Sequence, residues 1–413
     1  MAHCLIVGRG GFGDLFPLFA IAQQLQACGH TLTIAAESHH HDAVRSIGLA
    51  LHATDQVRAG IPARPGVRTE FLRFLNPSSL QSEFEQTLAA AHGADIIIGN
   101  QAAYVGRMVS RVQRIPWVYC AASPLALPSP TQPPLFPYLF GLQRRLRTTN
   151  WAQRPFLPLA QGVTRLFMQE NVAFQRRLGI WNGLHPRFEG LYSDQLNLLM
   201  VSPALMAKRP DWPARTTLAG FGWFEPRYMD DAAAQGHLDA FLQRGSAPVV
   251  IAPGGSTRTQ PTAFFETALA AVKGAGRRAV VVAAKRFHGQ LPQSDPDVLV
   301  CPYLPYSCLL HDACALIHSG GIGALGWAVR SGVPSLIVPK NWDHFDNAEI
   351  AEQANVARVV WRGGTEPQRV SAGLSELLAD RAIHASLARI GPALLAEDGA
   401  KKAAQAITEH LLA

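Results

Sequence analysis

The chain of 413 residues is long enough for two domains, each with its own core. Its 48% hydrophobic and 16% charged residues exclude a disordered protein and fit a packed α/β protein. The formal net charge of +7 favours anionic partners. The first predicted strand begins at residue 3, which leaves no room for a signal peptide before it. No apolar run reaches the roughly 18–20 residues that are needed to cross a bilayer. The six cysteines are scattered without the spacing of disulfide or metal-binding pairs. We therefore expect a reduced, cytoplasmic protein without a signal peptide.

The first half alternates apolar strands with helices, which predicts a doubly wound parallel sheet. The expected strands are His3–Val7, Thr31–Ala35, Leu49–Ala53, Asp95–Gly99, Pro116–Cys120, Leu196–Val201 and Thr217–Gly220.

The first strand runs into a glycine turn, Gly8-x-Gly10-x-x-Gly13, which matches a dinucleotide fingerprint, and Glu37 could hold a ribose. An NAD(P)-dependent oxidoreductase is therefore one alternative. However, Asp14 follows the last glycine and would repel a pyrophosphate at the helix N-terminus. This favours Asp14 as a general base facing a cleft, with helix capping as its alternative role.

Two segments interrupt the first half. Ser123–Gly141 contains six prolines, which predict a stiff, extended surface loop, and its aromatic end could form an apolar ligand wall. Between Arg144 and Arg177 there are seven arginines and one acid among apolar residues. This pattern fits either a basic face for the anionic inner surface of the cytoplasmic membrane or an ordinary solvated helix face. The basic residues match no nucleic-acid-binding module.

The second half begins after a linker at Phe221–Gly236 and repeats the strand–helix rhythm. Its expected strands are Val249–Ala252, Ala279–Ala283, Val298–Cys301, Ala315–His318 and Ser335–Val338, and helices are expected at Glu366–Ala379, Arg381–Leu395 and Ala400–Leu411. We predict a first domain at 1–220, a linker at 221–236, a second domain at 237–398, and a C-terminal helix at 399–413. Ligands should bind in the cleft between the halves.

The stretch from Ala315 to Asn347 predicts an anion site. A strand ends at His318, the glycine turn Gly320–Gly323 follows, and a helix begins there, so free backbone N–H groups and the helix dipole favour a phosphate. After the next strand we expect a polar loop carrying Asp343, His344 and Asp346.

No metal site is expected. Asp295-x-Asp297 fits turn chemistry better than metal binding. The three consecutive residues His39–His41 cannot all face one ion, and surface exposure is the expectation for them.

Three motifs together resemble those of the family-one, GT-B-fold nucleotide-sugar glycosyltransferases. They are Gly10–Pro17 with Gly29-His30, Gly255-Ser256-Thr257, and His318–Gly323 continuing through Gly332-Val333-Pro334 to Asp343–Ala348. The chain looks most like the rhamnosyltransferases of rhamnolipid synthesis, which share its GGIGA turn and DxFDNAE loop. The resemblance implies two Rossmann-like domains facing across a cleft. The first (1–220) would bind the acceptor and the second (237–398) the nucleotide sugar, and the C-terminal helix (399–413) would pack back on the first domain.

The resemblance also implies roles for particular residues. Asp14 would deprotonate the acceptor, Asp343 and His344 would contact the donor sugar, and Tyr303 and Leu304 would flank the nucleobase. The donor diphosphate would be held by Ser256, Thr257, His318, Gly320, Gly321, Ile322 and Gly323. The family normally has Gln where this chain has His344, which leaves the sugar open, and Gly11 replaces a hydroxyl residue of the family's N-terminal turn.

We therefore predict an inverting hexosyltransferase that uses a dTDP- or UDP-sugar, rhamnose-like or glucose-like, without an obligatory metal or other cofactor. The predicted acceptor is lipid-like, such as a hydroxyalkanoyl-alkanoate; the alternative is a polyketide, peptide or sterol aglycone. Aromatic residues are expected to line the acceptor site, namely Phe12, Phe136, Tyr138, Phe140, Phe167 and Phe174. A non-catalytic sugar-nucleotide or lipid-binding protein is disfavoured because Asp14 and His318 are both present.

Overall fold

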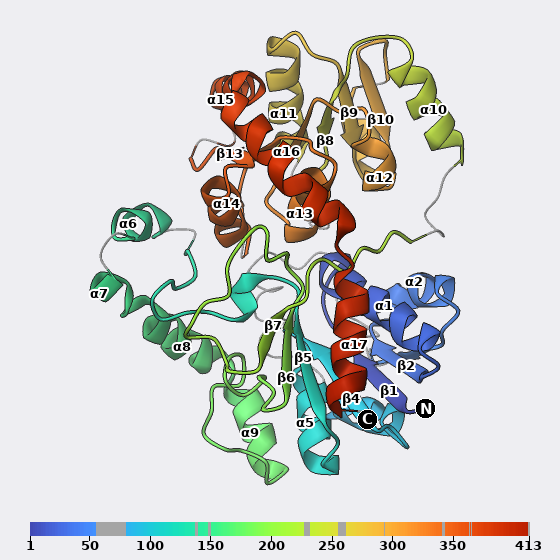
Figure 1. The fold of residues 1–413 in the computed structure, drawn as a ribbon, viewed down its shortest axis with the longest axis vertical. Coiled ribbons are helices and arrows are strands. Elements are labelled where there is room, and N and C mark those ends of the chain that lie inside the picture. The colour runs from blue at the N-terminus through green and yellow to red at the C-terminus, as the bar shows by residue number, and fades with distance from the viewer. Residues whose placement is uncertain are drawn as a thin grey trace.

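Two all-parallel sheets lie one above the other in the computed structural model of the protein (Figure 1). The structure describes residues 1–54, 80–136, 139–147, 150–226, 232–254, 262–292, 294–340, 343–362, 364 and 366–411. The lower sheet has the order β3-β2-β1-β4-β5-β6-β7, and the upper sheet has the order β10-β9-β8-β11-β12-β13. This architecture confirms the predicted fold class of two doubly wound parallel sheets.

The strands form where the sequence has short apolar runs, because a parallel sheet covered by helices is buried on both faces. In the lower sheet they are β1 (His3–Val7), β2 (Thr31–Ala36), β3 (Leu51–Ala53), β4 (Ile96–Asn100), β5 (Trp117–Ala121), β6 (Leu196–Leu199) and β7 (Thr216–Leu218). The upper sheet contains β8 (Val249–Ile251), β9 (Ala279–Val282), β10 (Val298–Cys301), β11 (Ala315–His318), β12 (Ser335–Ile337) and β13 (Ala357–Val359). Only β13 was not predicted.

The strand order fixes where ligands can enter. β1 pairs with both β2 and β4, and β11 pairs with both β8 and β12. The order reverses between β1 and β4 and again between β8 and β11, so each sheet has a topological switch point there. The turns after β1 and after β11 both begin at these switch points.

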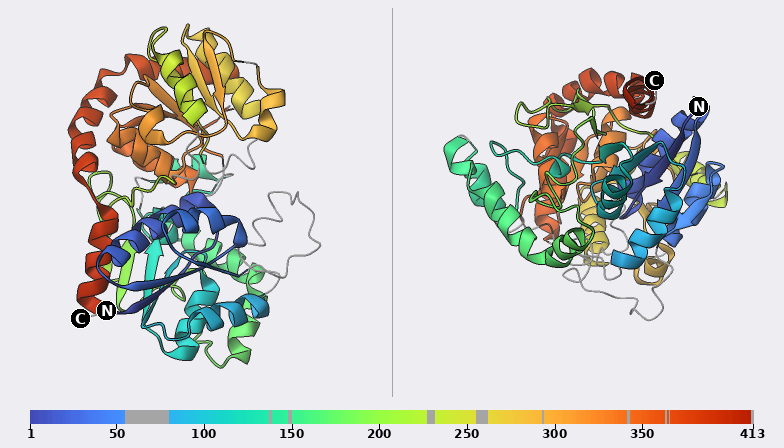
Figure 2. Two further views of the ribbon diagram at one scale, coloured as in Figure 1. Left: turned by 90° about the vertical axis from the view of Figure 1, so that its right-hand side faces the viewer. Right: turned by 90° about the horizontal axis from the view of Figure 1, so that it is seen from below.

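The helices cover the two sheets (Figures 1 and 2). Those of the first half are α1 (Phe12–Ala27), α2 (His41–Ser46), α4 (Leu80–Ala90), α5 (Tyr104–Gln113), α6 (Phe140–Arg145), α7 (Asn150–Gln153), α8 (Phe156–Phe167) and α9 (Gln169–Arg177). Those of the second half are α10 (Ala232–Leu242), α11 (Thr262–Gly274), α12 (Tyr306–Leu309), α13 (Ile322–Arg330), α14 (His344–Gln353), α15 (Pro367–Ala379), α16 (Arg381–Ala396) and α17 (Gly399–Leu411). No helix in the described part of the chain is both long and apolar enough to cross a membrane.

Three sequence predictions are corrected. The predicted polar loop around Asp343–Asp346 is the start of α14, whose polar residues are buried between the two halves. The predicted linker ends earlier, because α10 already begins at Ala232. The proline-rich segment Ser123–Gly141 contains the 3-10 helix η2 (Pro124–Ala126) and the start of α6.

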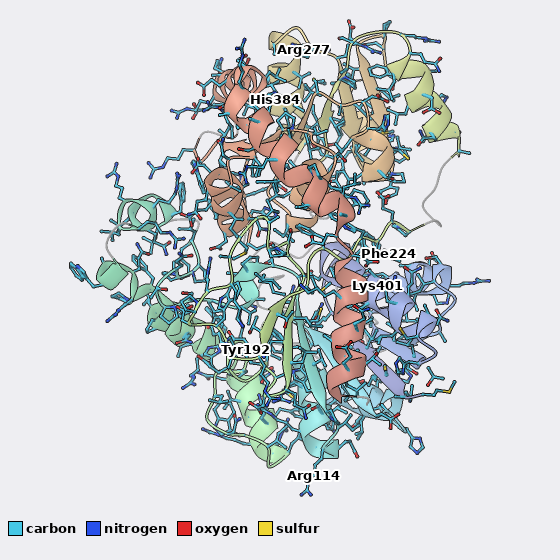
Figure 3. The ribbon with its side chains drawn as sticks, viewed as in Figure 1. Arg114, Tyr192, Phe224, Arg277, His384 and Lys401 are labelled. Carbon is cyan, nitrogen blue, oxygen red and sulfur yellow. The ribbon has the colours of Figure 1, made fainter. Side chains whose placement is uncertain are left out.

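The C-terminal helices join the two halves along one side. α16 and α17 run consecutively from the upper sheet to the lower one (Figure 2). Apolar residues of α17, including Ala403 and Ile407, share one buried cluster with Leu18 and Leu25 of α1. Near this junction Phe224 packs against Phe16 at 5.1 Å between ring centroids (Figure 3).

Polar and aromatic contacts join the halves on the other side. Arg147 forms an ion pair with Glu349 of α14. The Asp346 carboxylate accepts a hydrogen bond of 3.1 Å from the backbone N–H of Leu135. The ring of Phe140 packs against those of Phe345 and Trp361, at 5.2 and 5.7 Å, and these two rings are 6.5 Å apart. Residues of the arginine-rich segment therefore serve, in part, to hold the two halves together.

Candidate active site

The turn after β1 presents the carboxylate of Asp14. Gly10 has φ +114°, and a Cβ there would lie 2.5 Å from Asp14 Oδ2, so the turn requires glycine. Asp14 is in the first turn of α1, and its Oδ2 accepts a hydrogen bond of 3.0 Å from the Gly11 N–H. The capping role that the sequence offered as an alternative is therefore real, and it still leaves Asp14 partly exposed.

Gln101 fixes the other carboxylate oxygen. Its Nε2 donates to Asp14 Oδ1 at 2.6 Å, while its Oε1 accepts from the Ala122 N–H at 3.2 Å. Because the Ala122 N–H can only donate, the orientation of the amide is determined. The sequence analysis missed Gln101. Its position directly after β4 was the available signal, because the carboxyl ends of parallel strands meet at one edge of a sheet.

The environment of Asp14 raises its pKa from 3.8 to about 7. Burial is the largest cause, followed by the negative charge of Asp343, while the hydrogen bonds from Gly11 and Gln101 and the charge of Arg187 act in the opposite direction. A carboxylate with this pKa is suited to accept a proton near neutral pH. Asp343 precedes α14 of the upper half, so the two acids approach each other from opposite halves of the molecule.

The turn after β11 has the same backbone form. Gly320 has φ +97°, and a Cβ there would lie 2.9 Å from the carbonyl oxygen of His344. Gly321 is the N-cap of α13, so the N-terminus of this helix opens beside the turn. Backbone N–H groups and the helix dipole make such a terminus favourable for anions.

His318 ends β11 and is fully buried. Its Nδ1 accepts a hydrogen bond of 3.2 Å from the Gly320 N–H, so the ring proton lies on Nε2. Burial, followed by the neighbouring His344, lowers the pKa of His318 to about 3, and the ring is neutral at pH 7. Among the described residues Nε2 has no hydrogen-bond partner, and a buried donor in this state is stabilised by an incoming oxygen atom.

Asn347 connects the turn to the acidic end of α14. Its Nδ2 donates to the Gly320 carbonyl at 2.9 Å and to Asp343 Oδ2 at 2.8 Å. The sequence analysis assigned it no role, although it lies four residues after Asp343, on the same face of the helix. His344 is buried, and burial lowers its pKa. The structure thus brings together His318, Asp343 and His344, as the sequence predicted.

The other predicted donor contacts are only partly described. Ser256 and Thr257 lie outside the described residues. Tyr303 is half-buried after β10, whereas Leu304 is buried in an apolar cluster of the upper half. Their proposed contact with a nucleobase remains a prediction.

The predicted acceptor residues do not share one surface. Phe140 lies in the aromatic cluster between the halves, and Phe174 is buried against Phe84 at 5.5 Å. Phe167 is exposed at the end of α8, and Phe136 is half-buried in the segment before α6. Phe12 is half-buried near Asp14, and Tyr138 lies outside the described residues. Their role as acceptor contacts remains a prediction.

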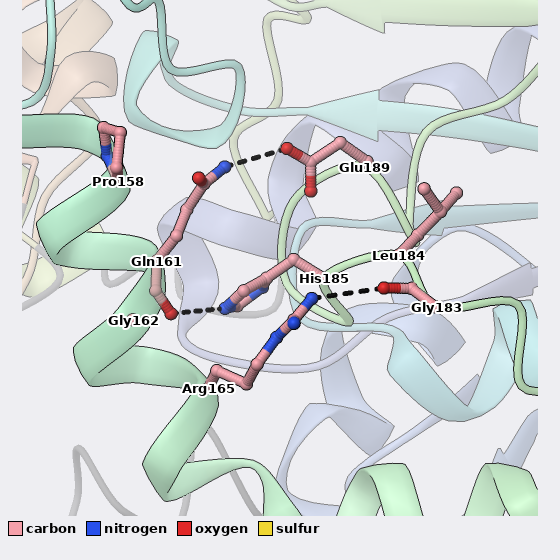
Figure 4. Close-up of a pocket in the computed structure, with 8 residues that line it drawn as sticks. All are labelled: Pro158, Gln161, Gly162, Arg165, Gly183, Leu184, His185 and Glu189. Carbon is pink, nitrogen blue, oxygen red and sulfur yellow. Dashed lines mark hydrogen bonds between the residues drawn. The ribbon is translucent and has the colours of Figure 1, made fainter. Parts of the chain in front are cut away.

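A pocket elsewhere involves none of the predicted site residues (Figure 4). It has a volume of about 480 Å³ and lies between α8 and the 183–189 segment. His185 on its wall is held by the Gln161 carbonyl at 3.0 Å. The chemistry of Asp14 and His318 lies outside this pocket.

The prediction that His39–His41 are surface residues is wrong for His40. Its ring is fully buried, and its Nε2 lies 3.0 Å from the carbonyl oxygen of Gly10. The ring packs against Phe12 at 5.2 Å, which the polar sequence around it did not indicate.

Comparisons with known proteins agree with this fold. Residues 268–410 match the family described as erythromycin biosynthesis protein CIII-like, C-terminal domain. An O-mycaminosyltylonolide 6-deoxyallosyltransferase from Streptomyces fradiae is 27% identical over 98% of this chain and 96% of its own. A glycotransferase of kitacinnamycin has a TM-score of 0.74 at 21% identity, covering 99% of both chains. A spinosyn rhamnosyltransferase complexed with thymidine diphosphate has a TM-score of 0.64 at 19% identity, covering 100% of both chains.

These similarities confirm the GT-B fold predicted from the sequence. They do not support the narrower resemblance to rhamnolipid-synthesis enzymes. The chain has the GT-B fold and is similar to nucleotide-sugar glycosyltransferases, and its C-terminal part matches the erythromycin biosynthesis protein CIII-like family.

Proposed function

We propose that this protein transfers a hexose from a dTDP- or UDP-sugar to a hydroxyl group of a polyketide or peptide aglycone, with inversion at the anomeric carbon. The observation that carries the proposal is the approach of Asp14 and Asp343 from opposite halves, close enough for the charge of Asp343 to raise the pKa of Asp14. A base on one half thus faces a predicted sugar-binding carboxylate on the other.

In this reaction Asp14 accepts the proton of the acceptor hydroxyl while the oxygen attacks the anomeric carbon. The diphosphate leaves from the opposite face, so the base and the leaving-group site must lie on opposite sides of the sugar. His318 Nε2–H and the N-terminus of α13 are the groups that stabilise the charge developing on the diphosphate. Protonated Asp14 then releases its proton to solvent.

The proposed class of acceptor, a polyketide or peptide aglycone, is based on the names of the similar proteins. Their names refer to tylonolide, kitacinnamycin and spinosyn, which favours the aglycone alternative over the lipid-like acceptor that was the main sequence prediction. Thymidine diphosphate in one of these structures favours a dTDP-sugar as donor. A rhamnolipid-type acceptor and contact with an anionic membrane remain weaker alternatives.

A binding and activity screen tests the proposal. Thermal shifts are measured with dTDP, UDP and NAD, and transfer is followed by mass spectrometry with dTDP-rhamnose, dTDP-glucose and UDP-glucose. The acceptors are a macrolide aglycone, a glycopeptide aglycone, a sterol and a hydroxyalkanoyl-alkanoate. We expect stabilisation by dTDP or UDP and a glycosylated macrolide or glycopeptide. Stabilisation by NAD alone would support the oxidoreductase alternative, and transfer only to the alkanoate would restore the lipid prediction.

The predicted aromatic acceptor wall is tested separately. If Phe136 and Phe140 contact the acceptor, replacing each with alanine raises the acceptor KM while the donor KM stays constant. Phe140→Ala also removes contacts with Phe345 and Trp361, so its melting temperature must be measured. An unchanged KM for every apolar acceptor in both variants would remove these residues from the acceptor site.

A further inference from the structure

Glu37, His39 and His40 converge just after β2, in and beside the 3-10 helix η1 (Ser38–His40). One ligand atom from each, a carboxylate oxygen and two ring nitrogens, lies within 4.8 Å of the other two. We propose that these three side chains bind a divalent transition-metal ion of the zinc type, next to the glycine turn that presents Asp14. Nitrogen and carboxylate oxygen ligands suit this class of ion.

The hydrogen bond of His40 prepares its ring for a metal. Its Nε2 lies 3.0 Å from the Gly10 carbonyl oxygen, which can only accept, so Nε2 carries the proton and Nδ1 carries the lone pair. Histidines that bind metals in proteins are commonly held by a carbonyl in this way. The fold therefore selects the tautomer of His40 in which Nδ1 is the nitrogen that can bind an ion.

The other two ligands are accessible to an ion from solvent. His39 Nδ1 and Glu37 Oε2 are 4.0 Å apart, and their side chains are 34% and 16% exposed. Metal bonds of about 2.0–2.2 Å at tetrahedral angles need ligand atoms roughly 3.4 Å apart. Because both side chains reach solvent, they can close this gap by rotation, whereas the ring of His40 stays fixed by its packing.

The ion would connect the end of β2 to the turn that carries the proposed base. His40 holds the Gly10 carbonyl, and the next residue, Gly11, donates its N–H to Asp14. We assign the ion a structural role there, because none of its three ligands contacts Asp14 in the described interactions. His41 is excluded from the site: its side chain is 60% exposed and pairs with Asp42 at 3.3 Å.

Calorimetric titration of zinc chloride into the full chain tests the proposal, after removal of any polyhistidine tag and treatment with a chelator. We expect one saturable site per chain and a rise in melting temperature of a few degrees with zinc. His39→Ala and Glu37→Gln should each weaken binding at least about 100-fold, because loss of an outer-shell partner alone costs about 10–100-fold. Both positions reach solvent, so these variants should fold.

His41→Ala is the matched control and should leave the affinity unchanged. X-ray absorption of the zinc-loaded protein should show two histidine ligands. Absence of a saturable site in the wild type, or an affinity that is equal in His39→Ala and the wild type, would overturn the proposal. Neither measurement uses donor or acceptor, so the outcome is independent of the proposed transferase activity.

Discussion

The turns after β1 and after β11 have the same backbone form and opposite chemistry. Each follows a buried strand at a switch point, contains a glycine with positive φ, and leads into a helix. The first turn places the acid Asp14 at the helix N-terminus, whereas the second leaves that terminus open and puts the neutral His318 beside it. We therefore propose that the same structural element provides a proton acceptor in one half and an anion site in the other.

This difference indicates that one side chain can determine whether a helix N-terminus is available to bind an external anion. In the lower half the carboxylate already takes the hydrogen bond of the free Gly11 N–H, so an external phosphate has less to gain there. In the upper half the Nε2–H of His318 has no such partner in the described structure and is available to an anion.

The largest effect is expected from Asp14→Asn, which keeps the shape and removes the base. Its kcat should fall by about 10²–10⁴, the usual contribution of a general base. Affinity for dTDP or UDP should stay close to that of the wild type, because the anion site lies in the other half. Calorimetry measures the nucleotide affinity and steady-state kinetics measure kcat. Asp42→Asn, at an exposed side chain, is the control. Near-normal turnover would remove Asp14 from catalysis.

His318→Ala should weaken the proposed anion site at the turn after β11. A hydrogen bond to a charged group contributes roughly 1.5–3 kcal/mol, so affinity for the free nucleoside diphosphate should fall about 10–100-fold. The pH dependence assigned to Asp14 should remain. His311→Ala, at a side chain that is 79% exposed, is the control. Unchanged affinity by calorimetry would refute the phosphate role.

Replacing the positive-φ glycine of each turn with alanine tests whether the two turns have different roles. In Gly10→Ala the new Cβ meets the Asp14 carboxylate, and in Gly320→Ala it meets the backbone of His344. We expect the first to lower kcat and the second to raise the donor KM, each roughly tenfold or more. Gly29→Ala shares the positive φ, +84°, without a close contact, and controls for backbone strain of about 1–2 kcal/mol. Identical kinetic effects of the two variants would contradict the division of roles.

The smallest effect is expected in the pH profile. Because the base acts when deprotonated, kcat/KM of the wild type should rise with pH up to about 7 and then level off. Gln101→Leu removes a hydrogen bond that lowers the pKa of Asp14, so the rise in kcat/KM should move to higher pH. At pH 6 the kcat/KM of this variant should be up to about tenfold lower than that of the wild type. Gln81→Leu, on the exposed face of α4, should leave the profile unchanged. A Gln101→Leu profile that matches the wild type would exclude this positioning role.

Local patterns in the sequence were enough to predict most of the fold. The apolar runs at His3–Val7, Val298–Cys301 and Ala315–His318 match β1, β10 and β11 at both ends, because a buried parallel strand is a continuous apolar run. The short β13, Ala357–Val359, lacked that signal, since two of its three residues are only half-buried. The start of α14 was missed because its polar residues are buried by contacts with the other half rather than exposed on a loop.

The order of residues along the chain was enough to predict the two parallel sheets and the two glycine turns, and to select Asp14 and His318 as candidate site residues. The partners of these residues became known only from the folded structure. Gln101 reaches Asp14 from the turn after β4, Asn347 connects Gly320 with Asp343, and His40 turns inward to the Gly10 carbonyl. These contacts join residues up to 87 positions apart, so no local pattern contains them. The negative charge of Asp343, which raises the pKa of Asp14 together with burial, likewise comes close only once the two halves have packed together.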